Sequence, residues 1–212
     1  MEKVDLKRSL DAYRAKPGEL RIVDVPELQY LMLDGRGDPN GPAFAEALEA
    51  LYPVAYALKF ASKRELGRDY AVMPLEGLWW ADDMDAFTIV RDKANWQWTL
   101  LMLVPDWIDG AMVDDAVAAV AAKRAPARLH DVRLEPLAEG RCVQTLHVGA
   151  FDDEGPALER MHRDFIPERG LRMTGRHHEI YLSDARRVDP AKRRTILRQP
   201  VVAAQPGTAP GS

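Results

Sequence analysis

Apolar and polar residues alternate along the chain in two patterns, one typical of strands and one typical of helices. Runs rich in β-branched and aromatic residues predict strands at about 20–25, 28–33, 70–80 and 96–104, and again at 132–137, 142–149, 177–183 and 194–202. Apolar residues three and four positions apart predict helices that begin at Pro42 and Pro156, and an alanine-rich helix covers 109–124. The same order of predicted strands and helices therefore occurs twice along the chain.

The two halves also share a sequence repeat. GRGDPNGPAFAEALEALYP at 35–53 aligns without a gap with GAFDDEGPALERMHRDFIP at 149–167, and the alignment superimposes the Gly-Pro-Ala of 41–43 on that of 155–157. A duplication of this kind predicts an α+β fold. In it, two β-α-β-β units related by pseudo-two-fold symmetry form one antiparallel sheet with the helices on one face.

This duplication also predicts the organisation of the chain. We expect a single domain over 1–202, with a first repeat at about 20–105, a linking helix at about 109–124 and a second repeat at about 130–202. The Pro- and Gly-rich residues 203–212 are expected to form a flexible tail. Ligand pockets often lie between packed parts of a protein, so a ligand groove is expected at the seam, where the two halves meet.

Composition narrows the class of protein. The 212 residues carry a net charge of −4, which argues against a general nucleic-acid binder. Cys142 is the only cysteine, so the chain can form neither a disulfide framework nor a thiolate metal site. The N-terminus lacks the apolar run of a signal peptide, and the apolar run at 98–104 is too short to cross a bilayer. We therefore expect a cytoplasmic protein without membrane attachment.

Motifs for cofactors and metals do not occur in the sequence. There is no GxxxxGK[ST] phosphate loop, no GxSxG and no HExxH, so no cofactor and no metal site are expected. The sequence does not indicate an oligomeric state.

Two glutamates on comparable strands, Glu76 and Glu179, are the candidate working carboxylates. A carboxylate on a sheet face could bind a cation or polarise a water molecule; the alternative interpretation is a glutamate on a half-exposed strand that faces solvent. Gly77 indicates a bulge that would redirect Glu76.

Strand alternation decides which neighbours accompany Glu179. His177 and Tyr181 should share its face, and His178 and Ile180 should lie on the other face. Because the second set includes the apolar residues, we expect it to face the helices, with Glu179 on the open side of the sheet.

Aromatic residues crowd the first half of the chain. All five tryptophans fall within 79–107, and Trp79 and Trp80 should point to opposite faces of one strand. Tyr52, Tyr56 and Phe60 form a stripe on the first helix. Ordinary core packing is one interpretation of this crowding. The other is an aromatic cage, in which each cation–π contact is worth about 0.5–2 kcal/mol.

Four segments carry a resemblance to a known family. PLEGLW at 74–79, LHVGAFDDE at 146–154, HHEIYLSDARR at 177–187 and TILRQPV at 195–201 resemble stand-alone members of the GyrI-like small-molecule-binding domain family. This family belongs to the SOUL/effector-binding-domain superfamily, with the effector domains of multidrug-sensing transcription regulators. The similarity covers about 20–201. It implies an aromatic-lined groove at the seam, with Glu179 at the position of the ligand-facing glutamate.

The resemblance also implies candidate functions. The first is binding of xenobiotics, either hydrophobic or cationic aromatic small molecules. The second is hydrolysis of cyclopropane-bearing DNA-alkylating natural products, which some stand-alone members perform, with Glu179 positioning the water and Tyr181 beside it. The third is a non-catalytic role as a protein-interaction partner, such as a modulator of DNA gyrase. The expected ligand-binding residues are Tyr52, Tyr56, Glu76, Trp79, Trp98 and His177.

Direct binding of nucleic acid is not expected. The regulators of the superfamily carry an N-terminal winged helix-turn-helix, whereas only about 20 residues precede the first predicted strand in this sequence.

Overall fold

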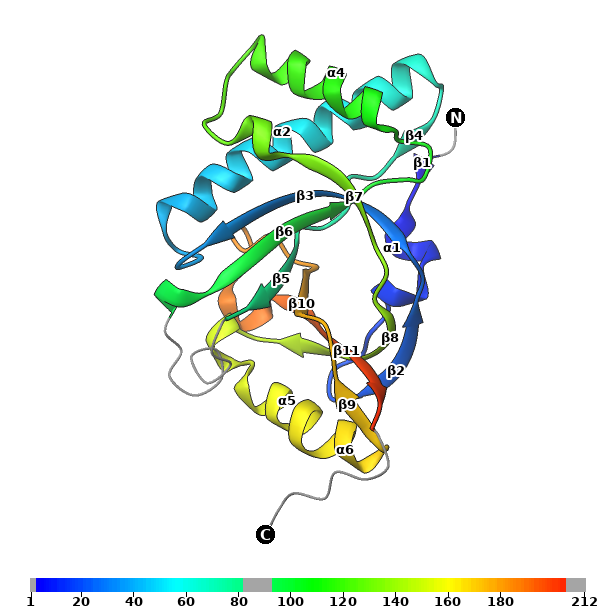
Figure 1. The fold of residues 1–212 in the computed structure, drawn as a ribbon, viewed down its shortest axis with the longest axis vertical. Coiled ribbons are helices and arrows are strands. Elements are labelled where there is room, and N and C mark those ends of the chain that lie inside the picture. Colours follow the sequence, from blue (N-terminus) through cyan, green and yellow to red (C-terminus); the bar gives the residue numbers. More distant parts are fainter. Residues whose placement is uncertain (1–2, 82–92, 205–212) are drawn as a thin grey trace.

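The computed structural model describes residues 3–81 and 93–204 (Figure 1). The aspartate-rich connection at 82–85 and residues 205–212 of the expected tail lie outside these ranges. Within the described residues, nine strands form one sheet whose pairings are antiparallel. These strands are β2 (Arg21–Val25), β3 (Leu28–Arg36), β5 (Glu76–Trp80), β6 (Gln97–Leu103), β7 (Arg133–Leu137), β8 (Gly140–Val148), β9 (Leu171–Met173), β10 (His177–Tyr181) and β11 (Arg194–Ala203).

The order of the strands confirms the predicted duplication. Leaving aside β9, which pairs with β11, the order is β2-β8-β11-β10-β5-β6-β3-β7. Exchanging β2 with β7, β3 with β8, β5 with β10 and β6 with β11 gives the same order read from the opposite edge of the sheet. The first strand of each half pairs within the other half, and the pseudo-two-fold axis lies between β5 and β10. This central pair of strands is the seam.

The helices of the two repeats and the helix that links them cover one face of the sheet, as the sequence predicts. The long helix α2 (Pro42–Glu65) and α4 (Gly110–Ala121) pack on the first half. On the second half lie α5 (Gly155–Glu159), a π-helical turn at Arg160–Phe165 and α6 (Ile166–Glu168). Figure 1 shows the two groups at opposite ends of the curved sheet.

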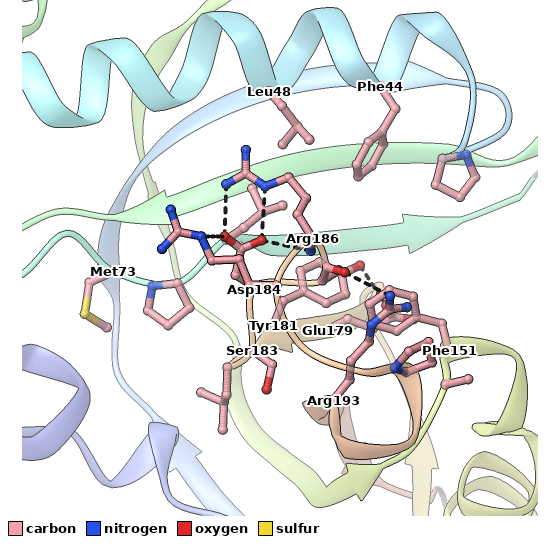
Figure 2. A pocket seen from close by; sticks show the side chains of 18 of the residues that line it. Phe44, Leu48, Met73, Phe151, Glu179, Tyr181, Ser183, Asp184, Arg186 and Arg193 are labelled. Atoms are coloured by element: carbon pink, nitrogen blue, oxygen red, sulfur yellow. Dashed lines mark hydrogen bonds and ion pairs between the residues drawn. The ribbon is translucent and has the colours of Figure 1, made fainter.

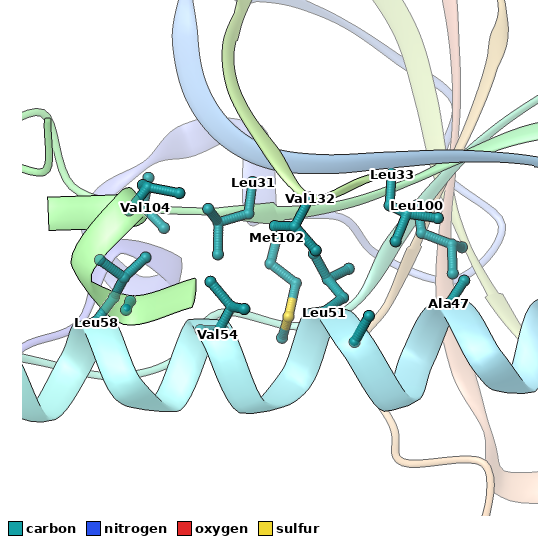
Figure 3. Close-up of a cluster of buried hydrophobic side chains, with 14 of the residues drawn as sticks. Leu31, Leu33, Ala47, Leu51, Val54, Leu58, Leu100, Met102, Val104 and Val132 are labelled. Atoms are coloured by element: carbon teal, nitrogen blue, oxygen red, sulfur yellow. The ribbon is translucent and has the colours of Figure 1, made fainter. Parts of the chain in front are cut away.

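Apolar side chains from α2 and the sheet form the largest core. Leu51, Val54 and Leu58 of α2 face Leu31 of β3 and Met102 of β6, and all are fully or almost fully buried (Figure 3). Burial of one such side chain contributes about 1.5–3 kcal/mol. This packing fixes the position of α2 along the first half of the sheet.

The opposite, concave face of the sheet is also buried. The N-terminal segment, residues 3–17, runs from β1 (Lys3–Val4), which pairs with β4 (Asp69–Tyr70), through α1 (Leu6–Ser9) to a 3-10 turn at Asp11–Tyr13. Ala12 and Tyr13 of that turn pack into a second core with Leu101, Ile180 and Ile196. Periodicity could not reveal this segment, because it contains only short elements.

Burial of both faces overturns one expectation. Ile180 faces the N-terminal segment and not the helices, whereas Tyr181 packs against the core of α2. Apolar residues on a strand identify the helix-covered face only when the other face is solvated. The helix-covered face therefore carries His177, Glu179 and Tyr181.

Two predicted elements are interrupted. The strand predicted at 70–80 is divided into β4 and β5 by residues 71–75, where Pro74 has no N–H to donate to a ladder. The helix predicted from Pro156 contains the π-helical turn at Arg160–Phe165. Gly77 makes no bulge, since β5 pairs through it with both neighbouring strands.

We predict that Gly35→Ala destabilises the fold. A Cβ at this position would lie 2.0 Å from the buried ring of Trp98 on the neighbouring strand, so the indole would have to move. Such overpacking costs about 1–3 kcal/mol in the free energy of unfolding, measured with urea. Gly110→Ala is the control, because a Cβ there meets nothing within 4 Å. Equal stability of the two variants would contradict this packing.

Candidate functional site

A groove of about 900 Å³ follows the seam on the helix-covered face. Its floor is the β5–β10 pair, in which Glu179 lies opposite Gly77. One wall is α2, with Phe44, Leu48, Tyr52 and Tyr56, and the other includes Phe151 and Leu158 from the second half. Figure 2 shows Phe44 and Leu48 on one side of Glu179 and Phe151 on the other.

Hydrogen bonds hold the carboxylate of Glu179 in place. The hydroxyl of Tyr181 donates to Oε2 of Glu179 at 2.7 Å, and it accepts a hydrogen bond from Nε1 of Trp79 at 3.0 Å. Burial and the neighbouring Glu179 carboxylate raise the pKa of Tyr181 well above its usual value. Tyr181 therefore stays protonated and remains a donor to Glu179.

The other carboxylate oxygen of Glu179 lies beside a histidine. Nε2 of His177 is 3.6 Å from Oε1 of Glu179, and the ring of His177 contacts that of His162 edge-on at 6.2 Å between centroids. Burial and then His177 lower the pKa of His162 to about 4, so His162 is neutral near pH 7. His177 lies behind the carboxylate and is not among the residues that line the groove.

The absence of a side chain at residue 77 makes room for this arrangement. A Cβ on Gly77 would lie 2.7 Å from Nε1 of Trp79 and 3.2 Å from the hydroxyl of Tyr181. Glycine at this position lets Trp79 and Tyr181 meet above the floor of the groove.

Aromatic rings surround the carboxylate. Trp79 stacks on Phe44 at 6.1 Å between ring centroids and meets Trp96 edge-on at 5.8 Å. Phe151 meets Tyr181 edge-on at 5.5 Å. Flat walls with a carboxylate between them can hold a flat organic molecule, and a carboxylate can neutralise its positive charge or accept a proton from water.

Three arginines from the end of β10 to the start of β11 add charge at the rim. Both oxygens of Asp184 accept hydrogen bonds from Arg186, at 3.0 and 3.1 Å, and Arg187 lies 3.6 Å from the same carboxylate. Arg186 also lies over the ring of Tyr52. Arg193 lies over the ring of Phe151, 5.2 Å from its centroid.

The structure brings most of the predicted site residues together. Tyr52, Tyr56, Trp79, Glu179 and Tyr181 all line the groove. Trp79, and not Trp80, faces it, since Trp80 packs against the core of the concave face.

Trp98 is a core residue and not a wall of the groove. It is fully buried, its indole N–H donates to the carbonyl of Gly37 at 3.2 Å, and its ring fills the space above Gly35. Its indole N–H is thus hydrogen-bonded and its ring is packed within the fold.

Glu76 does not line the groove, contrary to the expectation that it mirrors Glu179. It pairs across the seam with Ile180, whereas Glu179 pairs with Gly77, so the two carboxylates point to opposite faces. Glu76 is fully buried on the concave face, where it accepts a hydrogen bond from Tyr13 and lies 3.0 Å from Nε2 of His178.

Glu76 belongs to a buried, charge-balanced network. His178 also contacts Glu139 at 3.0 Å, and Glu139 accepts a hydrogen bond from Arg198 at 2.7 Å. Arg198 in turn donates to the backbone carbonyl of Ala12 at 2.6 Å. Two carboxylates thus face two cations, and the network fixes the N-terminal segment to the underside of the seam.

Several lining residues were not predicted. Phe44 and Leu48 belong to the apolar stripe of α2, which as a pattern is indistinguishable from core. Phe151 lies within the LHVGAFDDE segment, which could have drawn attention to it. Arg193 is part of a basic run whose ordinary interpretation is a solvated surface.

Within residues 3–81 and 93–204, no group of three or more His, Cys, Asp or Glu side chains is arranged to hold a metal ion. None of the helices described there is long and apolar enough to span a membrane.

Comparison with known proteins identifies relatives of this groove-bearing fold. The GyrI-like small molecule binding domain matches residues 108–201. An uncharacterized conserved protein from Listeria innocua is 36% identical, with a TM-score of 0.86 over 94% of this chain and 100% of that one. A hydrolase from Listeria innocua is 35% identical, with a TM-score of 0.83 and the same coverage. The C-terminal domain of EcmrR shares the fold at 11% identity, with a TM-score of 0.57 over 88% of this chain and 98% of that one. No curated protein sequence matches the chain.

The buried network predicts how stability depends on pH. Burial alone would lower the pKa of His178, but Glu139 and Glu76 raise it from 6.5 to about 9. Protonated His178 therefore stabilises the fold. Its contribution is fully present below pH 6.5 and is lost as the pH rises to about 9. Urea unfolding from pH 6 to 9.5 should show that loss for the wild type and not for His178→Gln.

The exposed His130 provides the control, since His130→Gln should keep the wild-type dependence. A His178→Gln variant with an unchanged pH profile would contradict the assignment of a protonated His178.

On the acid side, His178 and Arg198 outweigh burial and lower the pKa of Glu139 from 4.5 to about 2. The ionised Glu139 therefore contributes stability that is lost as the pH falls from 4.5 to about 2.

Proposed function

The chain belongs to the GyrI-like family of small-molecule-binding proteins, and on that premise we propose that its groove binds flat hydrophobic or cationic aromatic compounds against Glu179. The observation that carries the proposal is the carboxylate of Glu179 between aromatic walls, held by Tyr181, which in turn accepts a hydrogen bond from Trp79. The compounds would be xenobiotics that have entered the cell, in keeping with the expected cytoplasmic location.

The energetics of the groove support a cation of this shape. Each contact between a cationic ring system and an aromatic wall is worth about 0.5–2 kcal/mol. Glu179 is largely buried, with 13% of its side chain exposed, so a cation beside it would be poorly screened by water. Tyr181 holds one carboxylate oxygen and leaves the carboxylate able to face the ligand.

Hydrolysis of a cyclopropane-bearing, DNA-alkylating compound is a second candidate function. It is favoured by the position of Glu179 and by the Listeria innocua relative described as a hydrolase. Glu179 would accept a proton from a water molecule whose oxygen bonds to a ring carbon. The strained C–C bond would break, and its electron pair would pass through the conjugated system to a carbonyl oxygen, which then takes up a proton.

A role as a non-catalytic interaction partner, such as a gyrase modulator, is the alternative. It would be favoured by a flat exposed face, whereas the seam between the two halves carries a groove of about 900 Å³ with a carboxylate at its floor. The groove therefore favours a small-molecule ligand.

We predict that Glu179→Gln weakens binding of the cationic dye rhodamine 123 by about tenfold, because loss of one poorly screened charge removes about 1.4 kcal/mol. Fluorescence anisotropy measures the dissociation constant. The control is Asp152→Asn, which removes a carboxylate of the groove whose side chain is 74% exposed and should change affinity little. Equal effects of the two substitutions would contradict the role of Glu179.

We also predict turnover of a cyclopropane-containing alkylator. Mass spectrometry should detect more than one equivalent of ring-opened product per protein, and Glu179→Gln should abolish turnover. Tyr181→Phe, which keeps the ring but loses the hydrogen bond, should lower the rate about tenfold or more. Tight binding without product would exclude hydrolysis of that compound and leave the binding function in place.

A further inference from the structure

Arg193 is a charged residue of the groove whose partners are neutral. It lies directly before β11, where its Nη2 donates to the carbonyl of Ala185 at 2.9 Å and its Nε to that of Val188 at 3.4 Å. Its guanidinium lies over the ring of Phe151. Among the described residues, no carboxylate oxygen lies within 4 Å of it.

Other cations along the groove differ from Arg193. The charge of Arg186 is met by both oxygens of Asp184, and Lys93 lies 3.4 Å from Asp152. Lys7 has no carboxylate partner within residues 3–81 and 93–204, but it is exposed to water at the rim. Arg193 is half-buried, and it combines an unneutralised charge with a fixed position.

The position of Arg193 relative to Glu179 follows from the rings between them. Phe151 lies under the guanidinium of Arg193 and meets Tyr181 edge-on, and Tyr181 donates to Glu179. Figure 2 shows Arg193 beside Phe151, at the end of the groove where Glu179 and Tyr181 lie. The groove thus presents a negative group and a positive group, separated by aromatic surface.

We propose that Arg193 determines specificity by binding a negatively charged or strongly polarised oxygen of the ligand. The ligand class is then a flat aromatic compound that carries a carboxylate, phenolate or conjugated carbonyl oxygen near the part that meets Glu179. A planar guanidinium suits such an oxygen, because it donates parallel hydrogen bonds from a fixed fork. The inference rests on the proposed small-molecule function and narrows its substrate class.

If the groove hydrolyses a conjugated cyclopropane, the same contact has a second consequence. Negative charge would build up on the carbonyl oxygen as the ring opens, and a cation already in position would stabilise it.

A pair of fluorescent dyes tests the inference. Rhodamine 123 and rhodamine 110 share one cationic ring system, and they differ in that the first carries a methyl ester where the second carries a carboxylate. The measured quantity is the ratio of their dissociation constants, which a purely structural role of Arg193 would not change. Arg193→Gln should weaken binding of rhodamine 110 about tenfold relative to rhodamine 123.

Two further variants complete the test. Arg193→Lys keeps the charge and loses the planar fork, so the ratio should shift in the same direction by about threefold. Arg194→Gln is the matched control, because Arg194 is exposed and does not line the groove, and it should leave the ratio unchanged. If Arg193→Gln does not fold, Arg193→Lys must still shift the ratio.

The outcomes separate the inference from the function on which it rests. Wild-type protein that binds neither dye would overturn both. Wild-type binding of both dyes, with a ratio that neither Arg193 variant changes, would overturn the inference and leave the proposed function standing.

Discussion

The pairing of β5 with β10 is the constraint on which the rest of the structure depends. It joins the two halves at their pseudo-two-fold axis and sets the register that places Glu179 opposite Gly77. Because Gly77 lacks a side chain, Trp79 can donate a hydrogen bond to Tyr181 above the pair, and Tyr181 holds the carboxylate. A shift of one residue in this register would turn Glu179 to the other face.

The two faces of this seam have different roles, and adjacent residues of β10 lie on opposite faces. Glu179 faces the groove, where its charge is available to a ligand. His178, one residue earlier, faces the concave side and joins Glu76, Glu139 and Arg198 in a network closed by the N-terminal segment. Removing one partner from a buried charge network costs about 3–5 kcal/mol. The network therefore holds the strands beneath the groove rigidly in place.

Much of the fold could be predicted because glycine and proline residues recur at equivalent positions in the two halves and so reveal the duplication. These positions anticipate the helices that begin at Pro42 and Pro156, and with them the groove between the halves. The face of Ile180 could not be predicted, since periodicity does not show that a distant segment buries the concave side. The direction of Glu76 could not be predicted for a different reason. A shift of one residue in the alignment of β5 with β10 reverses the face on which its side chain lies.

The central claim is that a flat cationic ligand binds at the seam with its charge beside Glu179. A crystal structure of the protein with rhodamine 123 tests it most directly. The account predicts that the ring system lies between the α2 wall and Phe151, with one of its two equivalent amino groups within about 4–6 Å of the Glu179 carboxylate. A dye bound elsewhere, or bound in the groove with both amino groups away from Glu179, would contradict the account.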